Sequence, residues 1–151
     1  MIDHVWTVLC SRAVVDKISN NVSLQNVIEQ VAVEAEPTPG AVIAMRPQVV
    51  TLWARSAPDS PVRGRARLTM RGPSGKDFGL VESEIDLSEH QRYRSLVTLE
   101  GLPAEEAGRH WIIVESREEG EGEWREVDRI PLVLVFSPKE ENRCGHAIYL
   151  N

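Results

Sequence analysis

The chain has 151 residues, of which 42% are hydrophobic and 26% charged, with a formal net charge of -6 and a pI near 5.3. This length and apolar content fit one domain with its own core, and they exclude a disordered chain or two ordinary domains. The negative charge argues against general binding of nucleic acid and against docking on an anionic membrane, because phosphate groups would repel the chain at long range.

The N-terminal segment lacks a basic region followed by an apolar stretch and a small-residue cleavage site. No apolar run approaches the roughly 20 residues of a membrane span. The two cysteines, Cys10 and Cys144, are expected as reduced thiols because disulfides are rare in reducing compartments, with a Cys10–Cys144 disulfide as the alternative. We therefore expect a cytoplasmic protein that does not bind membranes.

The first third of the chain alternates between extended segments and breaks. Residues 4–10 are rich in β-branched and aromatic side chains, which is typical of a strand, and the polar residues 17–21 suit a turn. Residues 22–36 are again extended in character, until prolines and a glycine interrupt them at 37–40. Another strand is predicted over residues 49–55, whose even positions are uniformly apolar.

Alternation of period 2 is clearest in two neighbouring segments, residues 63–71 and residues 81–87. The polar face of the first is a basic row formed by Arg63, Arg65, Arg67 and Arg71. The polar face of the second is an acidic row formed by Glu82, Glu84 and Asp86. The short linking segment, residues 72–77, fits a hairpin loop. Antiparallel pairing would therefore set the basic row beside the acidic row.

Three further strands are predicted over residues 93–100, 109–115 and 124–136. Before them, Ser88 is a suitable N-cap for one helical turn at 88–91. The charged, glycine-rich residues 118–123 indicate a solvated hairpin tip. Pro131 cannot donate a backbone hydrogen bond, so its strand should meet a bulge or a sheet edge there.

The whole pattern contains about eight to nine strands and no sustained helical periodicity. It predicts an all-β fold, a two-sheet antiparallel β-sandwich of immunoglobulin-like or jelly-roll-like type. We expect residues 1–136 to form this single domain and residues 137–151 to form a C-terminal tail that either docks as a last strand or stays mobile.

Several stretches of the chain, taken together, carry a family resemblance. They are Val8–Cys10, Val15–Asp16, Ser23–Glu29, Gly108–Glu115 and Ile130–Leu134. Together they resemble small uncharacterised bacterial β-sandwich proteins that carry a domain of unknown function. The resemblance implies a bacterial, cytoplasmic β-sandwich without an assigned activity, and it adds no catalytic residue.

Apolar side chains expected on an outer sheet face are the first candidate binding site. Parity places Trp53 opposite to Leu52, and it places Trp111 and Ile113 together, opposite to Ile112. Exposed aromatic and branched side chains on one face are typical of an interface core. The alternative is that a long connection or the C-terminal tail covers them.

The basic row is the second candidate, because guanidinium groups two residues apart grip phosphate or carboxylate groups. The interpretation that we favour is a set of solvated cross-strand pairs, worth about 0.2 to 1 kcal/mol each. In one register Arg67 faces Glu84 and Arg65 faces Asp86.

Two other residue sets suggest chemistry that their spacing does not require. A zinc set would consist of His4, Cys10, Cys144 and His146. A hydrolytic set would consist of His4, Ser11 and Asp16. A calcium-dependent membrane module ranks last, since it needs clustered Asp residues at one end of the sandwich.

The sequence thus predicts a non-enzymatic binding or assembly module that acts through an apolar sheet face, with no cofactor and no bound metal. Its expected partner is a second copy of the chain, giving a homo-oligomer, or another protein. The alternative is a small metal-dependent or hydrolytic enzyme that uses residues near the two termini.

Overall fold

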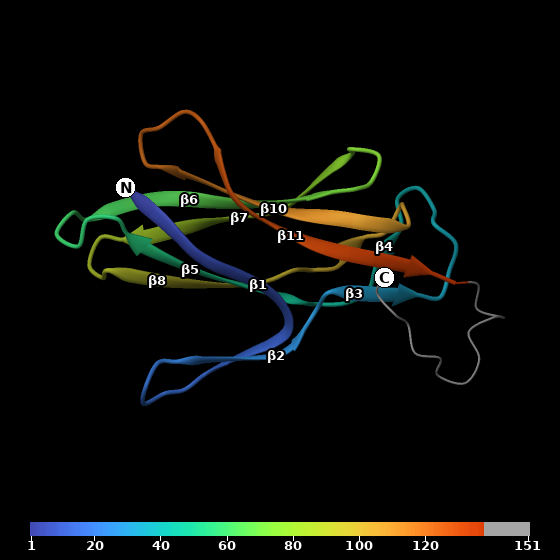
Figure 1. Ribbon diagram of the computed structural model, residues 1–151, viewed down its shortest axis with the longest axis horizontal. Coiled ribbons are helices and arrows are strands. Elements are labelled where there is room, and N and C mark those ends of the chain that lie inside the picture. The colour runs from blue at the N-terminus through green and yellow to red at the C-terminus, as the bar shows by residue number, and fades with distance from the viewer. Residues whose placement is uncertain (138–151) are drawn as a thin grey trace.

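The computed structural model describes residues 1–137, and these residues form two packed β-sheets (Figure 1). The strands are β1 (Ile2–Val15), β2 (Val22–Val27), β3 (Gln30–Val33), β4 (Val42–Ile43), β5 (Gln48–Arg55), β6 (Val62–Arg71), β7 (Asp77–Leu87), β8 (Arg92–Thr98), β9 (Leu102–Pro103), β10 (Gly108–Glu118) and β11 (Arg125–Phe136). Sheet A has the order β2-β1-β5-β8, sheet B has the order β3-β11-β10-β6-β7, and β4 pairs with β9 in a small third sheet. The predicted all-β sandwich is confirmed. Over the same residues, no helix has the length and apolarity to cross a membrane.

Neighbouring strands pair antiparallel, with one exception: β3 runs parallel to β11. The exception bears on Pro131, which lies opposite Trp111 of β10. On the other side of β11, pairing with β3 begins only at Val133. Pro131 therefore sits where β11 is a sheet edge, as its missing N–H requires.

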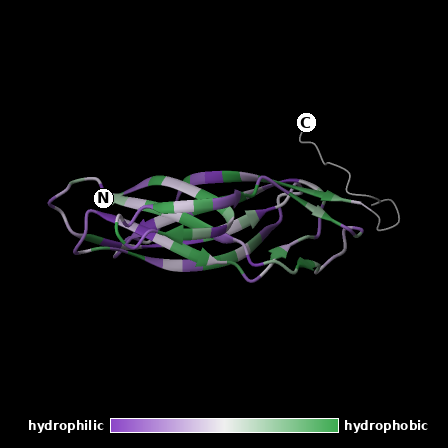
Figure 2. Ribbon diagram, turned by 90° about the horizontal axis from the view of Figure 1, so that it is seen from below, coloured by the Kyte–Doolittle hydropathy of each residue, from purple (hydrophilic) through white to green (hydrophobic). Residues whose placement is uncertain are grey.

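Alternating side chains build the core between the two sheets, and Figure 2 shows them as alternating bands of colour along the strands. In β6 the apolar parity points inward, with Ala66, Leu68 and Met70 buried. Gly64 belongs to the same parity. A Cβ there would collide with the carbonyl oxygen of Arg117 and with Ile2, so the close approach of β6 to β10 requires glycine.

Trp53 is a core residue, and the expectation that it lies on an outer sheet face is wrong. It has 0% of its surface exposed and shares its inward parity with Val49 and Thr51. Its ring contacts His4 edge-on, with the ring centroids 5.4 Å apart. The polar Thr51 is buried here because its hydroxyl accepts a hydrogen bond from Thr7 at 3.1 Å.

The outward parity of β5 is apolar as well, because part of the chain covers it. We call residues 10–27, the outer half of β1 with β2, the hairpin arm. It projects from sheet A at the bottom of Figure 1. Gln48 accepts a hydrogen bond from the Ala13 amide at 2.6 Å, and Arg94 of β8 donates to Asn20. Val50 also points to the outer side of sheet A, between these two hydrogen-bonded positions, and has 0% of its surface exposed.

Two local expectations are also wrong. In the β6–β7 hairpin Arg67 pairs with Glu82 and Arg65 with Glu84, two residues away from the register given above. A tight turn causes the shift: the Gly72 amide donates to the Lys76 carbonyl, and the register slips once more at a bulge. The helical turn at 88–91 does not form, because the amide and hydroxyl of Ser88 both donate to Asp86 instead.

Candidate functional site

The outer face of sheet B carries most of the predicted binding residues. They are Arg63, Arg65, Arg67 and Arg71 on β6, with Trp111 and Ile113 on β10. The register aligns the two strands so that Trp111 lies opposite Arg71 and Glu115 opposite Arg67. The face is therefore built by the same alternation that fills the core on the other side.

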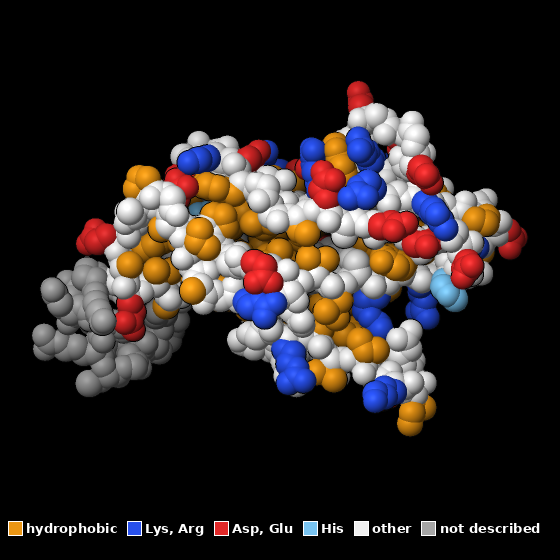
Figure 3. Space-filling view, turned by 180° about the vertical axis from the view of Figure 1, so that it is seen from behind, with side chains coloured by type: hydrophobic (Ala, Val, Ile, Leu, Met, Phe, Trp, Pro, Cys, Tyr) orange, Lys and Arg blue, Asp and Glu red, His pale blue; other side chains and the backbone are white. Residues whose placement is uncertain are grey.

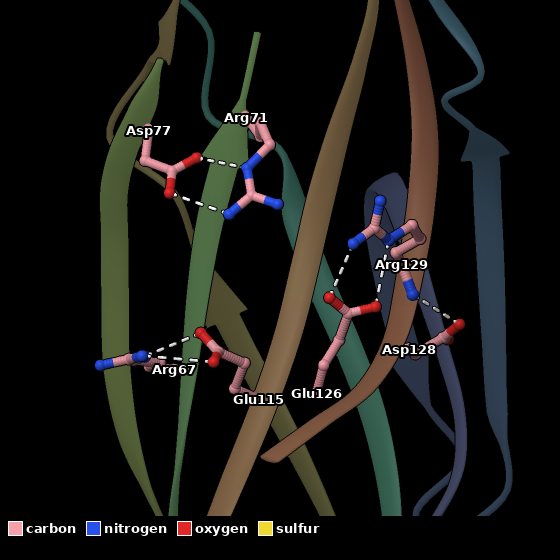
Figure 4. Close-up of polar contacts among 7 residues, drawn as sticks. All are labelled: Arg67, Arg71, Asp77, Glu115, Glu126, Asp128 and Arg129. Carbon is pink, nitrogen blue, oxygen red and sulfur yellow. Dashed lines mark hydrogen bonds and ion pairs between the residues drawn. The ribbon is translucent and has the colours of Figure 1, made fainter. Parts of the chain in front are cut away.

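Two arginines of β6 reach carboxylates on opposite sides of their strand (Figure 4). Arg67 donates to both carboxylate oxygens of Glu115 on β10, at 2.8 and 3.2 Å. Arg71 donates to both oxygens of Asp77 on β7, at 2.7 and 3.0 Å. Bidentate bonds of this kind fix the orientation of both partners. The three strands are thus joined across their outer face by side chains as well as by the backbone.

A third bidentate pair lies within β11. Arg129 donates to Glu126 at 3.1 and 2.7 Å. The remaining members of the basic row make longer contacts with acids, Arg63 with Asp86 and Arg65 with Glu82, each at 3.5 Å. We call the five pairs together the ion-pair ladder.

The hydrogen bonds of the ladder shift the ionisation of its members. Donation from Arg71 lowers the pKa of Asp77, and donation from Arg129 lowers the pKa of Glu126. The pKa of Asp86 is lowered mainly by the two bonds from Ser88 and less by Arg63. These carboxylates consequently stay ionised at a lower pH than free carboxylates do.

Each of two tryptophans on this face lies between two arginines. The guanidinium carbons of Arg67 and Arg117 lie 4.5 and 4.6 Å from the ring centroid of Trp124. Those of Arg109 and Arg129 lie 5.7 and 5.5 Å from the ring of Trp111. All four distances are within the range of cation–π attraction. Both indoles are half-buried, so part of each ring is still open to a partner.

Ile113 does not offer a contact, and the expectation that it is exposed is wrong. It points outward between Thr69 of β6 and Arg129 of β11, yet only 3% of its surface is exposed. The face is therefore a surface of tryptophan and paired charges with a buried apolar floor, and not the open apolar face predicted from the sequence.

His4 and Cys10, the two members of the predicted zinc set that the structure describes, do not form part of a metal site. His4 lies against Trp53, and its Nε2 is 2.6 Å from the Thr7 hydroxyl. Cys10 is a free, fully buried thiol whose pKa is raised by burial. Cys144 and His146 lie outside the described residues. Among residues 1–137, no three or more His, Cys, Asp and Glu side chains are grouped to hold a metal ion.

The hydrolytic set is also dispersed. The Ser11 hydroxyl accepts a hydrogen bond from Asn26 at 2.6 Å, within the hairpin arm. Asp16 accepts bonds from the Ile18 and Ser19 amides at the turn of the arm, which lower its pKa. Since His4 faces the core, these groups do not meet as nucleophile, base and orienting carboxylate.

Sequence reasoning missed several members of the face, namely Arg109, Glu115, Arg117, Trp124, Glu126 and Arg129. A signal was present in residues 109–117, because Arg109, Trp111, Glu115 and Arg117 share the odd parity and therefore one face of the strand. No protein-family model matches the chain, and no curated protein matches it either. The resemblance to small bacterial β-sandwich proteins therefore stays a prediction.

Proposed function

We propose that this protein is a non-enzymatic assembly module that self-associates through the outer face of sheet B. One observation carries the proposal: Trp111 and Trp124 lie on one face, and each is held between two arginines. Tryptophan and arginine are the residue types most enriched among the side chains that dominate interface energies. A bacterial cytoplasm, which the resemblance implies, is part of the same proposal.

The ion-pair ladder lowers the cost of covering this face. Burying an unpaired charge is strongly unfavourable, whereas Arg67, Arg71 and Arg129 each already contact a carboxylate of their own chain. Their positions are fixed before contact, so little side-chain freedom is lost on docking. Removing water from the stacked indoles would also strengthen the cation–π attraction.

The charge pattern favours a second copy of this chain as the partner. In a two-fold symmetric contact the same patch faces itself, so the patch must carry both signs of charge. The outward arginines are Arg63, Arg65, Arg67, Arg71, Arg109, Arg117 and Arg129. The outward carboxylates are Asp77, Glu82, Glu84, Asp86, Glu115 and Glu126. Such nearly balanced, interspersed charges suit the same surface better than they suit a strongly acidic or basic partner.

Pairing between the β7 edges of two copies is disfavoured. β7 is an edge strand of sheet B, and its polar parity consists of acidic side chains, among them Glu82 and Glu84. Two β7 edges would bring these like charges together. The register slip between Val81 and Gly79 also leaves Leu80 in a bulge, which interrupts the edge as a template. On sheet B, contact between faces is therefore favoured over pairing between two β7 edges.

Analytical ultracentrifugation of the untagged protein over a range of concentrations tests the proposal. We expect a reversible dimer in the wild type and a shift toward monomer in Trp111→Ser. The matched control is Ile18→Ser, which removes an apolar side chain that is 98% exposed at the turn of the hairpin arm. A wild-type monomer at every concentration, or equal loss of dimer in both variants, would contradict self-association through this face.

A further inference from the structure

The hairpin arm encloses a hollow of about 380 Å³ against the outer face of sheet A, away from the proposed interface. Its lining residues are Trp6, Ser19, Asn20, Asn21, Val22, Leu52, Arg92 and Arg94. Figure 3 shows the arm from behind, separated from the sandwich by a hollow along which Lys and Arg side chains gather. The volume is in the range of sites that hold small molecules.

Two arginines of β8 give the hollow its charge. Arg92 and Arg94 are two residues apart, so they point to the same side of the strand, outward from sheet A. Neither forms an ion pair with any carboxylate among residues 1–137. The arginines of the basic row, in contrast, each contact an acid. The hollow is thus lined by two guanidinium groups that form no ion pair in the described part of the chain.

The hydrogen bonds of Arg94 position the hairpin arm without neutralising the charge of the guanidinium. It donates to the backbone carbonyl and to the side-chain oxygen of Asn20, both at 2.9 Å, and both acceptors are neutral. Asn20 has a φ of 60°, the left-handed conformation that asparagine tolerates in turns. A guanidinium has five N–H donors, so Arg94 retains three for a ligand. The arm is held over sheet A, and the cation that holds it is still available.

The floor of the hollow is apolar. Trp6 of β1 lies directly opposite Leu52 of β5, and Leu52 lies opposite Arg94 of β8. One row across three strands therefore offers an indole, an aliphatic side chain and a guanidinium. Trp6 and Leu52 are both half-buried, so the floor is open toward the hollow.

We propose that this hollow is a binding site for a small organic anion, whose carboxylate or phosphate group contacts Arg92 and Arg94 while a flat apolar body lies on Trp6 and Leu52. Paired guanidinium groups match the two oxygens of a carboxylate or phosphate. A flat body makes good use of an indole, because stacking gains area at little cost in side-chain freedom. The site is independent of the proposed interface, which lies on the other sheet.

Nuclear magnetic resonance of the ¹⁵N-labelled full chain tests the proposal. The probes are phenyl phosphate, benzoate, inorganic phosphate and benzyl alcohol, and the indole signal of Trp6 is assigned by its loss in Trp6→Phe. We expect saturable shifts of this signal with phenyl phosphate or benzoate, and whichever binds more tightly identifies the preferred anionic group. Inorganic phosphate lacks the aromatic body and benzyl alcohol lacks the anionic group. Each should therefore bind about tenfold or more weakly than the better of the two aromatic anions.

Arg92→Gln is the decisive variant, because Arg92 makes no ion pair in the described part of the chain and its loss should leave the arm in place. It should weaken binding of the better probe about tenfold. The matched control, Arg125→Gln, removes the same charge from an exposed site on sheet B and should leave the affinity unchanged. The proposal would be overturned if the signal shifts do not saturate or are confined to other tryptophans. It would also be overturned if both variants weaken binding equally, or if inorganic phosphate binds as tightly as phenyl phosphate.

Discussion

The ion-pair ladder predicts that two pairs on the same sheet face differ measurably in strength. Arg67 and Glu115 share two bonds of 2.8 and 3.2 Å, and their side chains are 36% and 18% exposed. Arg65 and Glu82 share one contact of 3.5 Å, and their side chains are 47% and 51% exposed. Bidentate geometry and partial burial both strengthen a charged pair, whereas solvent screens an exposed one.

Double-mutant cycles measure this difference. For each pair, both single alanine variants and the double variant are unfolded in urea, and the coupling is the departure from additivity. We expect a coupling free energy of about 1 kcal/mol for Arg67 with Glu115 and about 0.2 kcal/mol for Arg65 with Glu82. In a domain of this size, 1 kcal/mol corresponds to a change in melting temperature of about 2 to 4 °C.

The cycle separates the ion pair from the stacking of Arg67 on Trp124. Arg67→Ala loses this stacking whether Glu115 is present or not, so the loss cancels in the coupling. All variants are made in a Trp111→Ser background, so that dissociation of a dimer does not contribute to unfolding. Equal couplings for the two pairs would refute the reasoning, since they would show that geometry and burial do not decide the strength of the ladder.

Two further predictions concern the core. Gly64→Ala should lower the free energy of unfolding by about 1 to 3 kcal/mol, because the new Cβ would collide with the backbone of Arg117. Gly79→Ala, where a Cβ meets open space, should change the free energy of unfolding by less than about 0.5 kcal/mol. Urea unfolding of both variants measures the difference. Burial lowers the pKa of His4, with partial opposition from Asp128, so the unfolded chain binds the proton more readily and stability should fall as the pH drops below about 6.5. His4→Gln should flatten this slope, and an unchanged slope would show that His4 does not cause it.

Alternation of apolar and polar side chains carries most of the information that the sequence holds about this fold. Residues 63–71 have one apolar and one charged parity, and the structure places each on the expected side. Residues 49–55 have apolar side chains on both parities, because sheet A has the core on one side and the hairpin arm on the other. Parity alone could not decide which side Trp53 faces.

The partners of the arginines depend on contacts that the sequence does not show. The acidic row of β7 is the nearest set of charges along the chain, yet Arg67 forms its bidentate pair with Glu115 of β10. A hairpin register is set by the tight turn and the bulge, and a shift of two residues keeps every side chain on its face while changing each partner. The face on which each arginine of β6 lies was therefore predictable, but its partner was not.

The net charge of -6 does not set the sign of either outer face. On sheet B, arginines and carboxylates alternate within contact distance, so their fields largely cancel a short way from the surface. Exposed charges further away are screened over about 8 Å at physiological salt. The ion-pair ladder of sheet B therefore contributes little field at Arg92 and Arg94, which face a separate surface under the hairpin arm. The two outer faces of this acidic protein thus differ in charge pairing, since the basic row on sheet B contacts carboxylates whereas Arg92 and Arg94 on sheet A form no ion pair among the described residues. Each proposal can therefore fail without affecting the other.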